Sequence, residues 1–196
     1  MGKHSILKGL SLSKQLSFTA VFAALCCVST LLLTLPLPTS GYFNTGDVFV
    51  LLSGWFLGPL FGSVAAGIGS ALADVFSGFM LYAPITLFVK ALDAFVAYLV
   101  WAFLKHLIKK DAFDFTVRAI SAIFGELVMI AGYFLFECIL YGAIGASANL
   151  LGNALQGVCC LVLATALCSL LYPVKPVRKF FPFLVFNPKP HANAHV

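Results

Sequence analysis

The sequence predicts an all-α integral membrane protein with six transmembrane helices and both termini in the cytoplasm. Of the 196 residues, 61% are hydrophobic and only 10% are charged, whereas soluble domains have about 25% charged residues. The mean hydropathy is +1.03. The net charge of +5 does not indicate nucleic-acid binding, because the basic residues stand in short flanks between apolar segments. The lipid bilayer is therefore the expected surrounding of one membrane domain.

The first predicted helix covers residues 16–35 and is retained in the mature protein, because it is long enough to span a bilayer. Pro36 and Pro38 end it, since proline cannot continue a helix. Ala20 and Ala24 have the spacing of small residues that lets another helix approach closely. This face could pack inside the same bundle or against another protein.

Two shorter segments follow a loop at 36–46 that is rich in Pro, Gly, Ser and aromatic residues. The helix predicted over 47–61 is short for a full span, and Gly58 followed by Pro59 breaks it. The next helix, predicted over 63–82, is the richest in small residues. It is therefore expected to be central and tightly packed.

The remaining elements follow from alternating apolar and polar stretches. Pro84 fits the first turn of a helix. The predicted order is a helix over 84–104, a polar linker over 105–118, a helix over 119–141, a Gly/Ala/Ser turn over 142–148 and a helix over 149–172. The transmembrane domain thus covers residues 1–172. The tail, 173–196, contains five prolines and several phenylalanines, and it is predicted to be irregular and to lie at the cytoplasmic membrane interface.

The distribution of Lys and Arg orients these helices. With the N-terminus in the cytoplasm, eleven of the twelve basic residues fall in segments on the inner side. They are Lys3, Lys8, Lys14, Lys105, Lys109, Lys110, Arg118, Lys175, Arg178, Lys179 and Lys189. The twelfth, Lys90, lies within a predicted span. This pattern follows the positive-inside rule and predicts a multi-pass protein with six spans.

Several motifs are missing from the sequence. It contains neither the Gly-rich loop that holds ATP phosphates nor a dinucleotide-binding fingerprint. The six cysteines lie in apolar segments without metal-ligand spacing and are interpreted as reduced packing residues. We therefore expect no metal, no cofactor and no catalytic residues, and any use of ATP would require another subunit.

Polar residues inside the predicted spans converge on the outer leaflet. At about 1.5 Å per helical residue, depths within the outer leaflet are expected for Asp47, Asp74, Lys90, Asp93, Tyr133, Glu137, Asn149, Asn153 and Gln156. Charged residues in lipid are costly and usually mark a site. A structural interpretation is also open, in which Asp74, Lys90 and Asp93 form a buried charge network. Asp47 and Asn149 could cap helices instead of binding a ligand.

Four aromatic residues are expected at the depth of this polar cluster, namely Tyr42, Phe43, Tyr82 and Tyr133. They could belong to an interfacial aromatic belt, or they could enclose a flat ring. Together with the polar groups they predict a concave, outward-facing pocket for a small heteroaromatic or polar ligand. Such a pocket is net negative and disfavours free anions unless Lys90 is unpaired.

Several short motifs of the chain carry a family resemblance. They are Gly41-Tyr42-Phe43-Asn44 with Gly46-Asp47, Leu57-Gly58-Pro59, Gly62, Gly67-Ile68-Gly69-Ser70-Ala71-Leu72-Ala73-Asp74, Tyr82-Ala83-Pro84 and Lys90. Over about residues 12–172 the chain resembles the S component, the substrate-capture subunit, of energy-coupling factor (ECF) vitamin transporters. It is similar to the branch of small S components tied to vitamin B6 or to hydroxymethylpyrimidine, a precursor of thiamin.

The resemblance implies a mechanism and a set of partners. It implies high-affinity binding of a scarce vitamin, closure of the first outer loop, and docking on a membrane T subunit coupled to two ATPase subunits in a prokaryotic plasma membrane. It also implies that Ala20 and Ala24 form the docking face. By position, the implied ligand-site residues are Phe43, Asn44, Asp47, Tyr82, Lys90, Tyr133, Glu137, Asn149 and Asn153. Glu126 is expected to be a deeper structural or coupling residue.

Two other readings remain open. The chain could be a stand-alone facilitator or a purely structural membrane subunit, which would work without ATPase partners. It could also be an intramembrane enzyme that uses Asp74, Lys90 and Asp93 or Glu137 for acid–base chemistry. The predicted spans contain no histidine and no nucleophile motif, which disfavours the enzyme.

Overall fold

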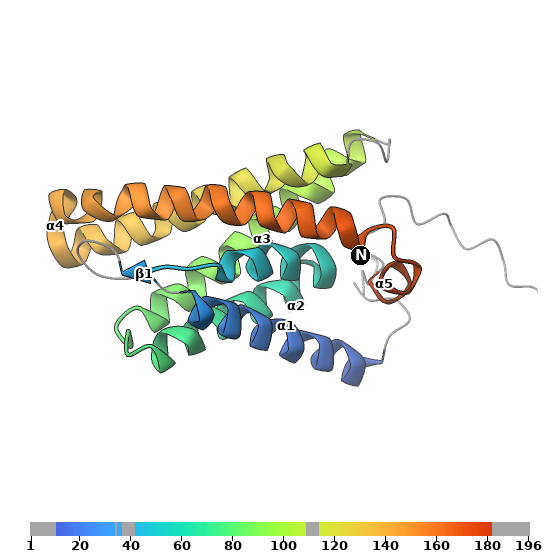
Figure 1. Cartoon of the computed structure of the whole chain (residues 1–196), viewed down its shortest axis with the longest axis horizontal. Helices are drawn as coiled ribbons and strands as arrows, with labels where there is room; N and C mark the ends of the chain where they lie inside the picture. Colours follow the sequence, from blue (N-terminus) through green and yellow to red (C-terminus); the bar gives the residue numbers. More distant parts are fainter. Residues whose placement is uncertain (1–10, 34, 37–41, 109–113, 182–196) are drawn as a thin grey trace, which may run out of the picture.

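The structure, a computed structural model, describes residues 11–33, 35–36, 42–108 and 114–181. Its elements, in chain order, are α1 (Leu12–Leu32), β1 (Leu35–Pro36), β2 (Tyr42–Phe43), α2 (Gly46–Phe76), α3 (Ala83–Leu107), α4 (Asp114–Leu171) and α5 (Lys175–Phe180). The long helices lie side by side along the long axis of the molecule (Figure 1). β1 and β2 form a small antiparallel ribbon in which Leu35 pairs with Phe43.

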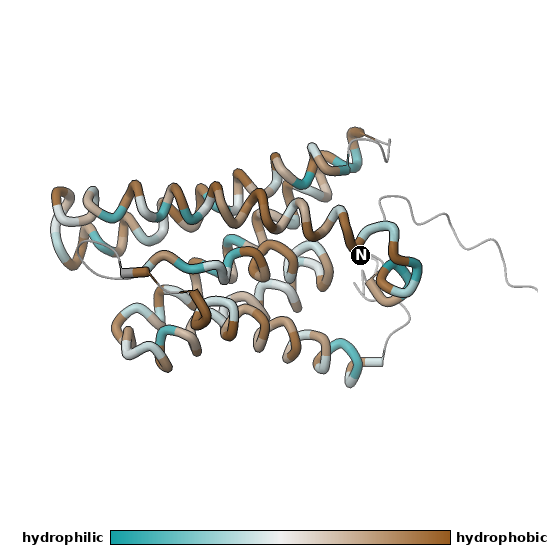
Figure 2. The backbone as a smooth tube through the Cα atoms, in the orientation of Figure 1, coloured by the Kyte–Doolittle hydropathy of each residue, from teal (hydrophilic) through white to brown (hydrophobic). Residues whose placement is uncertain are grey.

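Four of the helices, α1 to α4, are long and apolar enough to cross a membrane. Their surfaces carry large exposed apolar side chains along most of their length, such as Leu60, Phe88, Ile139 and Val162. Figure 2 shows apolar segments along these helices and a hydrophilic stretch where β2 leads into α2. A soluble protein rarely exposes so much contiguous apolar surface, so the all-α membrane protein predicted from composition is confirmed.

Two of these helices contain a single non-helical residue at which the chain changes direction. In α2 it is Gly58, with φ 81° and Pro59 after it, as the predicted break required. In α4 it is Gly142, with φ 73°, and Figure 1 shows α4 folding back on itself as a long hairpin. Positive φ is accessible to glycine at little cost. The turn predicted over 142–148 is therefore wrong in extent, because the chain is helical again directly after Gly142.

The limb of α2 before Gly58 is the enclosed centre of the bundle. Nearly every residue from Gly46 to Gly58 is buried, including Trp55 and Leu57 at 0% exposure. The expectation that the following helix would be central is only half right. Gly67 and Gly69 of that limb do approach the backbones of α3 and α1 closely, but its opposite face exposes large apolar residues.

Several predicted boundaries shift by a few residues. α1 covers Leu12–Leu32 instead of 16–35, and α2 ends at Phe76, six residues before the predicted end. Pro84 does lie in the first turn of α3. α4 begins at Asp114 instead of residue 119, so the ends of the predicted polar linker are helical, while residues 109–113 lie outside the described part.

The tail is not irregular throughout, because Lys175–Phe180 forms the short helix α5. Pro176 stands in its first turn, a position that tolerates proline. Phe181 follows it and packs edge-on against Phe18 of α1 and Phe56 of α2, with ring centroids 5.0 and 5.1 Å apart. The tail thereby closes one end of the bundle. Residues 182–196, which include Phe183 and Phe186, lie outside the described residues.

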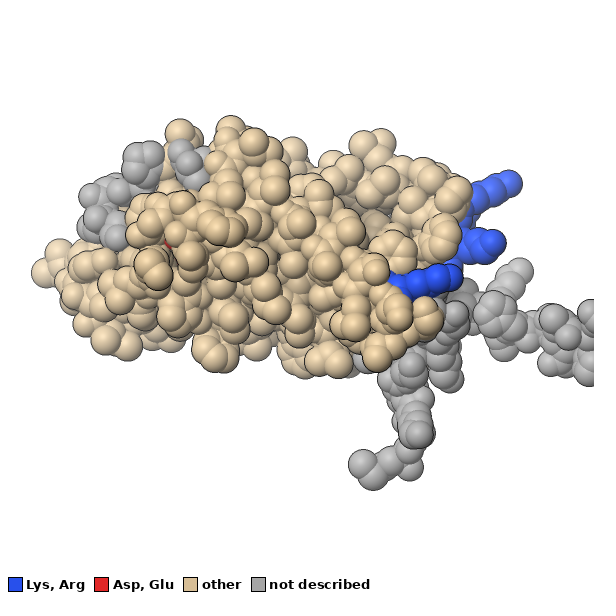
Figure 3. Space-filling model, turned by 90° about the horizontal axis from the view of Figure 1, so that it is seen from below, with Lys and Arg blue, Asp and Glu red and all other residues tan. Residues whose placement is uncertain are grey.

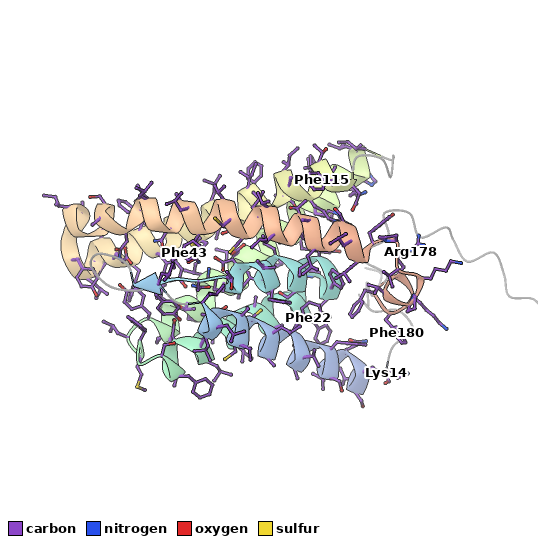
Figure 4. The ribbon with its side chains drawn as sticks, in the orientation of Figure 1. Lys14, Phe22, Phe43, Phe115, Arg178 and Phe180 are labelled. Carbon is purple, nitrogen blue, oxygen red and sulfur yellow. The ribbon has the colours of Figure 1, made fainter. Side chains whose placement is uncertain are left out.

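The basic side chains gather at the end of the molecule that carries α5. Figure 3 shows Lys and Arg there and almost no charge on the rest of the face formed by described residues. Lys14 and Arg178 lie at this end, whereas Phe43 lies toward the opposite end (Figure 4). This separation gives the bundle one basic end and one end that carries the β-ribbon.

A buried ion cluster joins α3 to α4 near the basic end, and we call it the Asp114 clasp. The carboxylate of Asp114 contacts the ammonium of Lys105 and accepts a hydrogen bond from Nε of Arg118 at 2.7 Å. The Arg118 guanidinium also lies 5.0 Å from the Trp101 ring and 5.4 Å from the Trp55 ring. Cation–π contacts of this kind are strongest when water is excluded, and Arg118 is fully buried.

Candidate functional site

A small hollow that opens to the surface lies at the end of the bundle that carries the β-ribbon, and about 40 Å³ of it is open to a molecule the size of water. We call it the pocket. It is bounded by β2, the segment before α2, the end of α2, the start of α3 and both limbs of α4. The residues that line it are Tyr42, Asn44, Asp74, Phe79, Tyr82, Thr86, Tyr133, Glu137, Asn153 and Gln156.

Aromatic rings form much of the pocket wall. The rings of Tyr42 and Phe79 have centroids 5.0 Å apart, and Phe79 packs edge-on to Tyr82 at 6.4 Å. Tyr133 stands on α4, and its hydroxyl shares a 3.0 Å hydrogen bond with Thr86 of α3. Rings from three elements therefore converge, with spacings in the range favoured by aromatic pairs.

Two carboxyl groups line the pocket, and each is held by tyrosine. Tyr42 Oη donates a 2.6 Å hydrogen bond to Asp74 Oδ1. Burial, followed by the adjacent Asp74 carboxylate, raises the pKa of Tyr42, so its phenol stays protonated and keeps donating. On the other side, Glu137 Oε1 accepts hydrogen bonds from Tyr82 Oη at 3.4 Å and from Asn149 Nδ2 at 3.0 Å.

The second oxygen of each carboxyl group is not engaged. Asp74 Oδ2 and Glu137 Oε2 are buried, and neither has a hydrogen-bond partner among the described residues. Native structures leave few buried polar atoms in that condition. Both residues line the pocket, so a ligand that reaches these two oxygens would satisfy them.

Below the pocket, Gln156 connects the segment before α2 to a buried ion pair. Its Oε1 accepts the backbone N–H of Asn44 at 2.8 Å, and its Nε2 donates to Asp47 Oδ2 at 2.6 Å. The other oxygen of Asp47 contacts the ammonium of Lys90. Asn44 in turn accepts the backbone N–H of Gly46 through its side chain. One amide of α4 thus fixes the chain at the entrance to α2.

Lys90, Asp47, Asp93 and Glu126 form what we call the Lys90 cluster. The predicted network of Asp74, Lys90 and Asp93 is wrong in its pairing, because Lys90 contacts Asp47 of another helix and Asp74 binds Tyr42. The carboxyl groups of Asp93 and Glu126 are buried beside Gly125 and Gly157. Neither group has a hydrogen-bond partner among the described residues.

The structure places five of the nine predicted ligand-site residues on the pocket wall. They are Asn44, Tyr82, Tyr133, Glu137 and Asn153. The other four stand behind or beside it: Asp47 and Lys90 pair below, Asn149 supports Glu137, and Phe43 belongs to the β-ribbon. Neither predicted cap is observed, since the side chains of Asp47 and Asn149 bind other side chains instead.

Sequence reasoning missed two pocket residues, Phe79 and Thr86. Thr86 lies one helical turn after Tyr82 and one turn before Lys90, so the four-residue spacing on one face of α3 could have found it. Phe79 follows Gly78, which has φ 83°, in the connection from α2 to α3. No periodic pattern applies to such a position.

The predicted docking residues Ala20 and Ala24 of α1 are both exposed. Their neighbours Phe22 and Cys26 are buried on the opposite face of the helix. The small-residue face of α1 is therefore not used for packing within the described part of the chain. Within that part, no group of three or more His, Cys, Asp or Glu side chains could hold a metal ion.

Comparison with known proteins identifies the family to which this chain belongs. The model of the family described as "ECF-type riboflavin transporter, S component" matches residues 11–173. The chain belongs to this family. It is therefore the substrate-binding subunit of an ECF vitamin transporter, a class of membrane transport proteins and not of enzymes.

A relative of this S component is known from Pyrococcus woesei. It is described as "Uncharacterized protein in gap 3'region" and is 34% identical over 132 residues, which make up 67% of this chain and 83% of the relative. The family fits the pocket described above, because a capture subunit needs a ligand site near one membrane face.

Proposed function

We propose that this S component captures a small water-soluble heteroaromatic vitamin or precursor, namely a pyridine or pyrimidine compound such as vitamin B6 or hydroxymethylpyrimidine. The observation that carries the proposal is the pocket itself, in which aromatic rings in tilted and edge-on contact stand beside two carboxyl groups. Rings favour a flat ligand, and a few placed polar groups fix its orientation.

The size of the pocket supports a small ligand. The space open to a molecule the size of water is about 40 Å³, well below the roughly 300 to 1,000 Å³ of typical ligand sites. The walls would therefore have to move apart to admit a single-ring compound, and further apart for a larger one. Riboflavin, with three fused rings and a polyol chain, is the second candidate, and the description of the matching family supports it.

We further propose that the chain crosses the membrane six times with both termini in the cytoplasm. The helical segments on either side of Gly58 and of Gly142 would supply two crossings each, and α1 and α3 one each. The basic residues at the α5 end support placing that end inside. The pocket would then open toward the outer face, as expected for a protein in the plasma membrane of a prokaryote.

Partner subunits would complete the transporter. The exposure of Ala20 and Ala24 supports docking of α1 on a membrane T subunit, which two ATPase subunits would drive. The loop predicted over 36–46 would gate the pocket. Residues 37–41 of this loop lie outside the described residues, and at its described end Asn44 bonds Gln156 and Tyr42 bonds Asp74 of the wall.

Ligand binding to the purified full chain tests the capture role. Thermal shift assays with pyridoxine, hydroxymethylpyrimidine and riboflavin should show an increase in melting temperature for one single-ring compound. Because binding to the native state stabilises it by mass action, the shift should grow with ligand concentration. If none of the three compounds shifts the protein, the capture function is wrong. A shift with riboflavin alone would select the second candidate.

The docking role has its own test. Ala24→Trp should abolish vitamin uptake in cells that contain the T and ATPase subunits, while binding to the purified variant remains intact. Val21→Trp, on the same helix and also exposed, serves as the control for added bulk. Loss of ligand binding in Ala24→Trp would contradict a docking role. Uptake without the partner subunits would favour a stand-alone facilitator.

A further inference from the structure

The two unengaged carboxyl oxygens restrict the chemistry of the ligand. Asp74 is 5% exposed and Glu137 is 2% exposed, and they reach the pocket from different helices, α2 and α4. In each, one oxygen is committed to a tyrosine and the other has no partner among the described residues. An ionised carboxylate can only accept hydrogen bonds. A ligand that satisfies both groups must therefore donate at two places.

The pocket has no cation of its own to balance these groups. None of the ten lining residues is Lys, Arg or His. Lys90, the nearest ammonium group below the pocket, is bound to Asp47 and is not among the lining residues. Burying a carboxylate without a counter-charge is costly. A ligand that carries a positive charge would supply the balance that the lining residues lack.

The walls are suited to a cation as well as to a ring. Tyr42, Tyr82 and Tyr133 line the pocket, and aromatic rings attract positive charge when water is excluded. The ring of Tyr133 already lies 5.4 Å from the Lys90 ammonium, so Tyr42 and Tyr82 are the rings left for a cationic ligand. An anionic ligand would meet two carboxylates at short range, and this like-charge contact costs several kcal/mol. A phosphate ester is the most strongly disfavoured group.

We propose that the pocket binds its vitamin in a cationic, unphosphorylated form, with a protonated nitrogen at one of the carboxylates Asp74 and Glu137 and a second N–H or O–H donor at the other. This inference rests on the proposed capture function and narrows it to pyridines and pyrimidines that carry a net positive charge. In each carboxylate a tyrosine hydroxyl already occupies one oxygen, so the second oxygen is the one left for the ligand to satisfy.

A matched ligand series tests the proposal on the purified full chain. Pyridoxamine, pyridoxine and pyridoxamine phosphate differ in one group each, and 4-amino-5-hydroxymethylpyrimidine and riboflavin complete the panel. Affinities are measured by calorimetry at several pH values. One of the amino compounds should bind about tenfold or more tightly than uncharged pyridoxine, as expected for a charge-assisted hydrogen bond. The phosphate ester should not bind.

Two variants test whether Glu137 and Asp74 cause the preference for the amino compound. Glu137→Gln and Asp74→Asn keep the shape of each side chain and remove its charge. Each should lower the affinity for the preferred amino compound and reduce its advantage over pyridoxine. Asp114→Asn removes a carboxylate at the other end of the bundle, in the Asp114 clasp, and is the matched control, with unchanged affinity. If a variant does not fold, the ligand series on the natural protein decides the question alone.

The outcomes separate this inference from the capture function. Equal affinity for pyridoxine and both amino compounds, or tight binding of the phosphate ester, would overturn the proposed preference for a cationic, unphosphorylated ligand. The capture function would still stand. Binding of riboflavin alone would have the same consequence. If no compound binds, the capture function and the inference both fail.

Discussion

The two ends of the bundle differ in their ratio of buried acidic to buried basic groups. In the Asp114 clasp one carboxylate serves two cations, and two indole rings cover the Arg118 guanidinium. The half with the pocket contains five of the seven acidic residues of the chain, all buried, and one ammonium group, that of Lys90. The acidic residues in this half are Asp47, Asp74, Asp93, Glu126 and Glu137.

This difference separates a structural cluster from a binding site. The clasp combines its charges with each other and with aromatic rings, so it can stabilise the fold unaided. Among the described residues, the pocket half has more buried carboxylates than ammonium groups, and the lining residues Asp74 and Glu137 each have one buried oxygen without a hydrogen-bond partner. Proteins rarely leave buried acceptors unsatisfied except where a functional partner binds. Changes at the two ends should therefore have different effects on ligand binding.

The largest effect is expected for Asp47→Ala, which leaves the Lys90 ammonium buried without its carboxylate and also frees Gln156. Removing one partner of a buried pair costs about 3–5 kcal/mol. The free energy of unfolding in detergent should fall by that amount, and ligand affinity should fall with it. The double variant Asp47→Leu with Lys90→Met should regain much of the stability. If it is no more stable than the single variant, the ion pair is not the cause.

A smaller effect is expected for Asp114→Asn. The carboxylate is 12% exposed, so water can partly replace it, and Arg118 retains its contacts with the rings of Trp55 and Trp101. Losing a charged partner in a buried hydrogen bond costs roughly 1–3 kcal/mol. Unfolding measurements should show this loss, while calorimetry shows unchanged ligand affinity. A parallel loss of affinity would mean that the two ends are coupled.

The smallest effect is expected for Trp101→Phe. The ring remains below Arg118, and the indole N–H has no hydrogen-bond partner among the described residues. The cation–π contact weakens with the smaller ring, by less than about 1 kcal/mol. Thermal unfolding should shift slightly and ligand affinity should not change. A loss as large as that of Asp114→Asn would show that the indole contributes more than its ring face.

The sequence predicts the membrane class and most helices because apolar length and Pro/Gly breaks are local properties. The break at Gly58 and the placement of Pro84 follow from backbone chemistry alone. Residues such as Tyr133, Glu137 and Asn153 could be found because depth along a helix can be counted from its end. Polar groups at equal depth then become candidates for one pocket.

Partner choice between helices could not be predicted in this way. Lys90 and Asp93 have a spacing that permits pairing on one helix, but the ammonium meets Asp47 because α2 packs against α3 at that level. That contact depends on how the helices rotate and approach, which a single sequence does not encode locally. The reason that α5 could not be predicted is different. The prolines of the tail predict irregular structure, but Pro176 stands in the first turn of a helix, where proline is tolerated.

The hairpin of α4 also has a consequence for biosynthesis. Residues 138–148, around the reversal at Gly142, carry no charged side chain, whereas the other end of the hairpin contains Asp114 and Arg118 and leads on to Lys175. Moving one charged residue to the centre of a bilayer costs about 2.5–3.5 kcal/mol in insertion experiments. Glu137, the acidic residue nearest the reversal, is bonded to Asn149 of the opposite limb. The uncharged end of the hairpin can therefore be translocated at low cost. In the proposed topology, this is the end that crosses the bilayer during insertion.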